Sequence, residues 1–143
     1  LFPYTTLFRS INKKRLKNLK LLKQKDLLNQ KKEIFTLNNE FKKNKSNKIK
    51  LRQILDQTSI EDSELACDIK EKSQYKLKLI EQIFISDNRE KFLNIEIERA
   101  KKNLGKLIKE KELVDTKIKL ISQLENIEKE NKITNSMPPP KNN

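Results

Sequence analysis

The side chains of this sequence that could do chemistry are mostly lysines. Its 143 residues include 33 Lys and Arg, 20 Asp and Glu, one Cys, one Gly and no His. Without His the chain has no imidazole base, no Ser-His-Asp triad and no His-ligated zinc. One Cys and one Gly also exclude a thiolate metal site and a Gly-rich phosphate loop. We therefore expect no enzyme, no catalytic residues, no metal and no cofactor.

The chemistry that remains is electrostatic binding. Residues 11–55 carry 15 basic and three acidic side chains, whereas residues 56–143 carry 17 of each. This asymmetry predicts attraction of the first half to an acidic surface, whether protein, nucleic acid or anionic lipid. The candidate residues for binding an acidic partner are Lys42, Lys43, Lys45 and Lys48, because the apolar pattern is thinnest there. The basic run at residues 13–20 lacks interleaved aromatics, which makes nucleic acid the less favoured partner.

Long helices must position these charges. With 34% hydrophobic and 37% charged residues, the chain can line a seam between helices but cannot fill a layered core. The first helical pattern runs from about residue 12 to 57. Its apolar positions begin at Leu16, Leu19 and Leu22, and one heptad position then holds Leu27, Ile34, Phe41 and Leu55. In this register Asn44 and Lys48 lie in the seam and should weaken the packing locally.

The second helical pattern, from about residue 63 to 131, is more regular. Steps of four and three residues connect Leu65, Ile69, Lys72, Lys76, Leu79, Ile83, Ser86, Glu90, Leu93, Ile97, Ala100, Leu104, Leu107, Lys111, Val114, Ile118 and Ile121. Such a heptad series predicts a coiled coil. A second stripe of Leu113, Leu120, Leu124 and Ile127 allows more than one face to be buried. A break or kink at Ser86–Arg89 is an alternative to one straight helix, and Gly105 is another weak point.

The predicted fold is all-α: a long, elongated, two-helix antiparallel coiled-coil hairpin over residues 11–132. Its helices occupy about 12–57 and about 63–131, and its turn occupies about 58–62, where Thr58 and Glu61 have capping-box spacing. Residues 133–143 include three prolines at 138–140 and are predicted to be a disordered tail.

The first ten residues differ in composition from the rest of the chain. The string LFPYTTLFRS is what the triplets CTC TTT CCC TAC ACG ACG CTC TTC CGA TCT encode, and that DNA resembles a common sequencing adapter. We therefore expect residues 1–10 to be a non-native arm and the true N-terminus to be missing.

The aromatic side chains and the single cysteine allow less specific interpretations. Tyr75, Phe84 and Phe92 either fill the seam between the helices or anchor a partner. Cys67 occupies an outer heptad position and is expected to be an exposed thiol. No apolar run approaches the ~18 residues of a membrane span, and the single Cys favours a cytoplasmic location.

The organisation of the chain resembles the FliJ family, the small coiled-coil components of the bacterial flagellar type III export apparatus. The resemblance covers residues 11 to about 131 and includes the stretches RLKNLKLLKQKDLLNQKKE (15–33) and EIERAKKNLGKLIKEKE (96–112). It implies an antiparallel coiled coil, similar to the stalk subunit of rotary ATPases, that binds the export ATPase ring and the export gate and escorts export chaperones. It also implies peripheral association with the inner face of the cell membrane through that apparatus.

Two other functions remain open from the sequence. One is a generic coiled-coil scaffold or ATPase stalk subunit, because heptads serve many functions. The other is a basic helix that binds nucleic acid or a membrane surface.

Overall fold

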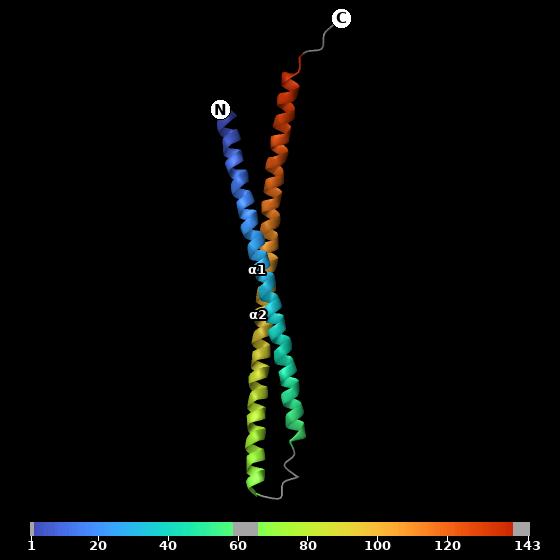
Figure 1. The fold of residues 1–143 in the computed structure, drawn as a ribbon. Coiled ribbons are helices and arrows are strands. Elements are labelled where there is room, and N and C mark those ends of the chain that lie inside the picture. Colours follow the sequence, from blue (N-terminus) through green and yellow to red (C-terminus); the bar gives the residue numbers. More distant parts are fainter. Residues whose placement is uncertain (1, 59–65, 139–143) are drawn as a thin grey trace. The chain divides into compact units, whose positions relative to one another are not determined.

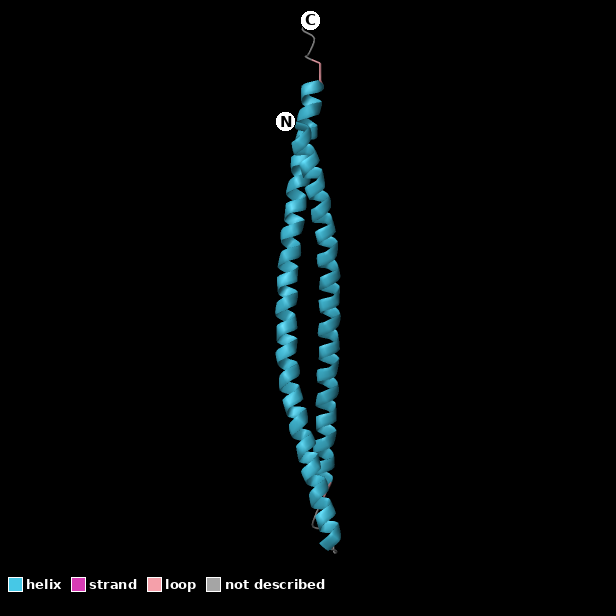
Figure 2. Ribbon diagram, turned by 90° about the vertical axis from the view of Figure 1, so that its left-hand side faces the viewer, coloured by secondary structure: helices cyan, strands magenta, loops and turns pink. Residues whose placement is uncertain are grey.

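Two long helices account for nearly all of the chain in a computed structural model that describes residues 2–58 and 66–138. The first helix, α1, spans Phe2–Gln57 (56 residues), and the second, α2, spans Ala66–Ser136 (71 residues) (Figure 1). Within these described ranges there is helix and loop but no strand (Figure 2). The all-α prediction is confirmed.

The chain divides into two compact units, each made of one segment from each helix. Unit 1 contains Leu1–Asn29 and Leu104–Asn143, and unit 2 contains Gln30–Asn103. In unit 1, Lys13, Lys20 and Lys23 of α1 pair with Glu125, Asp115 and Glu110 of α2. In unit 2, Gln30 and Asn44 donate hydrogen bonds to the carbonyls of Ala100 and Ser86. In both units the residue numbers rise on one helix as they decrease on the other, so the helices pack antiparallel as predicted.

The heptad register predicted for the second helix is confirmed by burial. The buried hydrophobic residues of α2 are Leu79, Leu93, Ile97, Ala100 and Val114, and all of them belong to the predicted series. The other members of that series from Lys72 to Ile121 are half-buried. Leu93 is the most buried large side chain among the described residues, at 1% exposure. Ile69 is more exposed, and Leu65 lies outside the described residues.

The register of the first helix is confirmed at Leu16 and from Leu27 onward, and it is wrong at Leu19 and Leu22. Leu27 is buried, and Ile34, Phe41 and Leu55 are half-buried. Leu19 and Leu22 are exposed, however, and Lys20 and Lys23 take the seam positions beside Leu16. Their aliphatic stems can cover the seam while their amines reach Asp115 and Glu110, so lysine replaces leucine there without an unpaired buried charge.

The ends of the helices differ from the predicted bounds. Helix α1 begins at Phe2 rather than near residue 12, because nothing in residues 4–11 breaks a helix. Helix α2 continues to Ser136 rather than ending near residue 131, so residues 133–136 of the predicted tail are helical. The side chains of Thr134 and Ser136 donate hydrogen bonds to the carbonyls of Glu130 and Ile133 in this last turn. The helix ends shortly before Pro138, which cannot continue it.

The predicted turn at about 58–62 lies mostly outside the described residues, as does Glu61. Thr58 is described, and its hydroxyl and backbone N–H both donate hydrogen bonds to the carbonyl of Ile54. The hydroxyl therefore satisfies a carbonyl at the C-terminal end of α1. The alternative of a break at Ser86–Arg89 is wrong, because α2 is one helix through these residues and through Gly105.

Candidate protein-interaction surfaces

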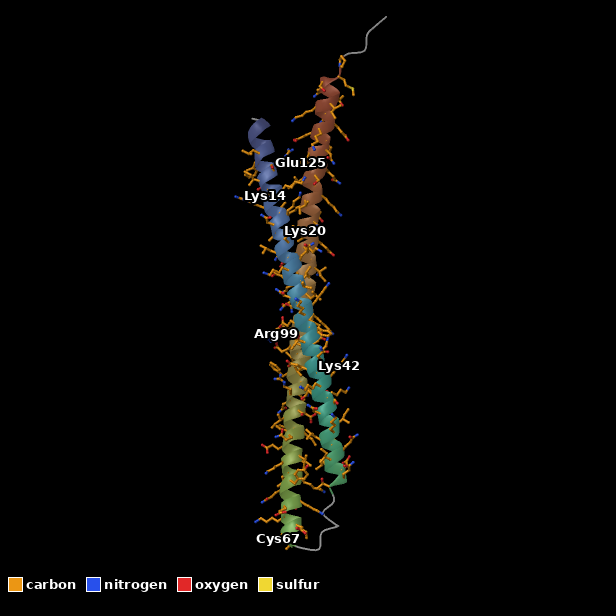
Figure 3. All side chains as sticks on the ribbon, viewed as in Figure 1. Lys14, Lys20, Lys42, Cys67, Arg99 and Glu125 are labelled. Carbon is orange, nitrogen blue, oxygen red and sulfur yellow. The ribbon has the colours of Figure 1, made fainter. Side chains whose placement is uncertain are left out.

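The four lysines predicted to bind an acidic partner separate into two groups in the structure. Lys42, Lys43 and Lys45 are exposed on α1 of unit 2, and Figure 3 labels Lys42. Lys48 lies in the seam, with a side chain that is only 12% exposed. Its Nζ atom is 2.8 Å from Oδ1 of Asp87 and also contacts the carboxylate of Glu90. Lys48 thus holds α1 against α2, whereas the other three lysines remain accessible to a partner.

Lys48 belongs to a polar layer that interrupts the apolar seam of unit 2. Asn44, one turn earlier, donates a hydrogen bond of 2.9 Å to the carbonyl of Ser86. Arg52, one turn later, lies 3.9 Å from Asp87. The seam positions of Asn44 and Lys48 are therefore as predicted, but both side chains have partners on the facing helix. Polar residues at such positions select one register and orientation of the helices at some cost in stability.

The ion pairs shift the pKa values of several groups in both units. The hydrogen bond from Lys48 lowers the pKa of Asp87, and the hydrogen bonds to Asp87 and then Glu90 raise the pKa of Lys48. In unit 1 the hydrogen bond from Lys20 lowers the pKa of Asp115, and the one from Lys13 lowers that of Glu125. Each shift favours the charged form that bridges the helices.

Pairing between the helices leaves much of the positive charge of α1 on the surface. Helix α1 carries 16 basic and four acidic side chains. Six of the basic ones pair with carboxylates of α2: Arg9, Lys13, Lys20, Lys23, Lys48 and Arg52. The other ten are exposed and outside the ion pairs of the described residues: Lys14, Arg15, Lys17, Lys25, Lys31, Lys32, Lys42, Lys43, Lys45 and Lys50. Figure 3 labels Lys14 and Lys42 among them.

Unit 1 also has an apolar groove between its two helix segments. The groove has a volume of about 440 Å³ and is lined by Asn12, Arg15, Leu16, Leu19, Lys117, Leu120 and Ile121. Leu120 belongs to the second stripe predicted from the sequence, and the whole stripe is exposed in the structure. The sequence therefore indicated the α2 side of this groove. It did not indicate that Leu19 would leave the seam and line the α1 side.

The aromatic side chains do not fill the seam. Tyr75, Phe84 and Phe92 are all exposed, so the interpretation that they pack between the helices is wrong. The guanidinium of Arg89 lies 6.0 Å from the ring centroid of Phe92 and also pairs with Glu40 across unit 2. Cys67 is exposed in the first turn of α2, as expected.

The described residues contain no group of three or more Cys, Asp and Glu side chains that could hold a metal ion. Within the same ranges no helix is long and apolar enough to cross a bilayer.

Comparisons of the chain with protein families, with characterised proteins and with solved structures find no match.

Proposed function

We propose that this chain is a coiled-coil component of the flagellar type III export apparatus that binds the acidic opening of the ring-shaped export ATPase. The observation that carries the proposal is the group of ten exposed basic side chains of α1 that no carboxylate of α2 neutralises. The antiparallel pairing of two long helices supports it, since it is the arrangement that the family resemblance implies. In that role the protein would also bind the export gate and escort export chaperones.

The proposed mechanism is electrostatic capture followed by mechanical coupling. The positive charge of α1 raises the rate of encounter with an acidic partner, and this rate decreases when salt screens the charges. The paired helices then resist bending more than one exposed helix would. No catalytic group is required of the chain in this role, and the ATPase supplies the chemical step.

The contact residues proposed within unit 2 are Lys42, Lys43 and Lys45. Lys48 is left out because a substitution there would break its bonds to Asp87 and Glu90 and would test the fold instead of the binding. The three remaining lysines are exposed and lie outside the ion pairs of the described residues.

The test is a binding and ATPase-stimulation assay with the cognate flagellar export ATPase. The variant Lys42→Glu, Lys43→Glu, Lys45→Glu should lower the association rate by at least ~10-fold at low salt, since each reversal replaces attraction with repulsion. The matched control is Lys70→Glu, Lys78→Glu, Lys91→Glu, three exposed lysines of α2 with the same total change in charge. Equal losses in the two variants would mean that net charge alone, and no face of α1, controls binding.

A duplex-DNA mobility shift at the same salt concentration tests the nucleic-acid alternative. Tight DNA binding without an ATPase interaction would overturn the proposed function. It would favour a basic helix that binds nucleic acid through phosphate contacts.

A further inference from the structure

The apolar groove of unit 1 has the features of an unoccupied site for a helix. Leu16 and Leu19 of α1 face it from one side, and Leu120 and Ile121 of α2 face it from the other. Leu19 is 38% exposed and Leu120 is 54% exposed, so both offer apolar surface to a partner. Exposed apolar side chains that form a contiguous patch are a common mark of an interaction site.

The apolar surface continues along α2 beyond the groove. Leu113, Leu120 and Ile127 follow one another at steps of seven residues, and Leu124 adds a fourth apolar side chain. All four are exposed. At 1.5 Å per residue the stripe is about 21 Å long, which corresponds to about four turns of a helix. This length and spacing fit an amphipathic helix that lies in a groove and anchors itself once or twice per turn.

The charge around the groove indicates which kind of partner helix would bind there. Arg15 and Lys117 line the groove, and neither forms an ion pair among the described residues. Across residues 7–29 and 104–138 there are 15 basic and seven acidic side chains, and four of the acidic ones already pair with α1: Glu110, Asp115, Glu125 and Glu128. A second copy of this chain would bring the same positive charges to the groove. An acidic partner would neutralise them.

We propose that the groove of unit 1 binds an acidic amphipathic helix of a partner protein, with apolar side chains against Leu19 and Leu120 and carboxylates beside Arg15 and Lys117. The bound helix would make unit 1 a three-helix assembly. This site is distinct from the lysines of unit 2, and it does not depend on which apparatus the protein serves.

The test uses the full chain and two synthetic peptides labelled with a fluorophore. Each peptide has about 18 residues, the length of five helical turns, with leucines at heptad spacing on one face. One carries glutamates beside the leucines, and the other carries lysines in their place. Fluorescence anisotropy should show that the chain binds the glutamate peptide and not the lysine peptide.

Two variants and a control connect the binding to the groove. The double variant Leu19→Gln, Leu120→Gln should weaken binding of the glutamate peptide by at least ~10-fold, since buried apolar anchors carry most of the affinity of such contacts. Leu28→Gln is the control. Leu28 lies in unit 1 and is 54% exposed, as Leu120 is, but it lies outside the lining of the groove. The double variant Arg15→Glu, Lys117→Glu should reverse the preference, so that the lysine peptide binds more tightly than the glutamate peptide.

Three results would overturn the proposal. The first is an absence of binding by the glutamate peptide at concentrations where the chain remains folded by circular dichroism. The second is equal binding of the two peptides. The third is self-association of the chain that Leu120→Gln abolishes, because the groove would then be an interface between copies. The ATPase assay with the Lys42, Lys43 and Lys45 variant is independent of these results, so either proposal can fail alone.

Discussion

The amine of Lys48 on α1 and the carboxylate of Asp87 on α2 lie 2.8 Å apart, at a level of the seam where a coiled coil ordinarily has apolar side chains. The same amine contacts Glu90, and the neighbouring Asn44 bonds to the carbonyl of Ser86. A shift of α2 by one heptad would separate all of these partners. The polar layer therefore favours one register of unit 2 over its neighbours.

Acid should weaken the contribution of this layer. Asp87 has a pKa below its ordinary value because Lys48 donates a hydrogen bond to it. In unit 1, hydrogen bonds from Lys20 and Lys13 lower the pKa values of Asp115 and Glu125 in the same way. A carboxyl group with a lowered pKa stabilises the fold above its unfolded pKa of about 4 and loses that contribution as the pH decreases through the folded value. The raised pKa of Lys48 acts in the opposite direction: its contribution is complete below the ordinary lysine pKa and is lost above it.

The test measures the urea concentration at the midpoint of unfolding, at several pH values between pH 2 and pH 7, for the native chain and for Asp87→Asn. The native chain should lose stability below about pH 4, where the carboxylates become protonated. The variant should be less stable at pH 7 and should depend less on pH. Asp56→Asn is the control, since Asp56 is exposed and outside the ion pairs of the described residues. A parallel pH dependence of both variants and the native chain would contradict this account.

Leu93 should be among the most sensitive apolar positions of unit 2. Its side chain is 1% exposed, so Leu93→Ala removes buried methyl groups and leaves a cavity between the helices. The expected loss is about 2–5 kcal/mol in the free energy of unfolding, measured by urea denaturation followed by circular dichroism. Leu77→Ala, at an exposed position of α2, should change the free energy by less than about 0.5 kcal/mol. Similar losses at the two positions would mean that the heptad register is wrong.

Gly105→Ala should stabilise the protein. Gly105 lies inside α2 with a helical backbone, and a Cβ atom placed there would meet nothing within 4 Å. Alanine is favoured over glycine in a helix by about 0.5–1 kcal/mol, because glycine loses more backbone entropy on folding. Thermal unfolding should show a melting temperature that is higher by a few degrees. A lower melting temperature would indicate that the glycine serves a bend or a close contact.

Removing residues 1–10 should have little effect on stability. Residues 2–10 continue α1, and Arg9 pairs with Glu128, but both side chains of that pair are substantially exposed to solvent. An exposed ion pair contributes about 0–1 kcal/mol. The truncated chain should therefore melt within a few degrees of the full chain, as monitored by circular dichroism. A larger decrease would mean that the arm is a packed part of unit 1.

The sequence predicted the fold and the α2 register well because apolar residues recur there over many heptads. From Lys72 to Ile121 every predicted seam position is at least half-buried. The sequence-based reasoning was wrong at Leu19 and Leu22, because it followed leucines at steps of three from Leu16. The register of Leu27 and Ile34, continued seven residues toward the N-terminus, instead places Lys20 in the seam. What α1 alone does not show is how Lys20 and Lys23 are accommodated there, since their partners Asp115 and Glu110 belong to α2.

The candidate site could be predicted only in part for a similar reason. The exposed positions of Lys42, Lys43 and Lys45 agree with the sequence-based reasoning about charge. The role of Lys48 depends on the carboxylates of Asp87 and Glu90, which lie about forty residues away in the sequence. Only the pairing of the helices brings these groups together. The groove of unit 1 likewise needs Leu19 from one helix and Leu120 from the other.

The direction of the ion pairs has a consequence for the order in which the chain is synthesised. Eight pairs connect α1 with α2 among the described residues, and in seven of them α1 supplies the cation. The exception is Glu40 with Arg89. A ribosome releases α1 first, when its 16 basic side chains have only four acidic ones on the same helix to offset them. We therefore expect two nascent copies of α1 to repel each other, which disfavours pairing of α1 with a second α1 before the carboxylates of α2 emerge.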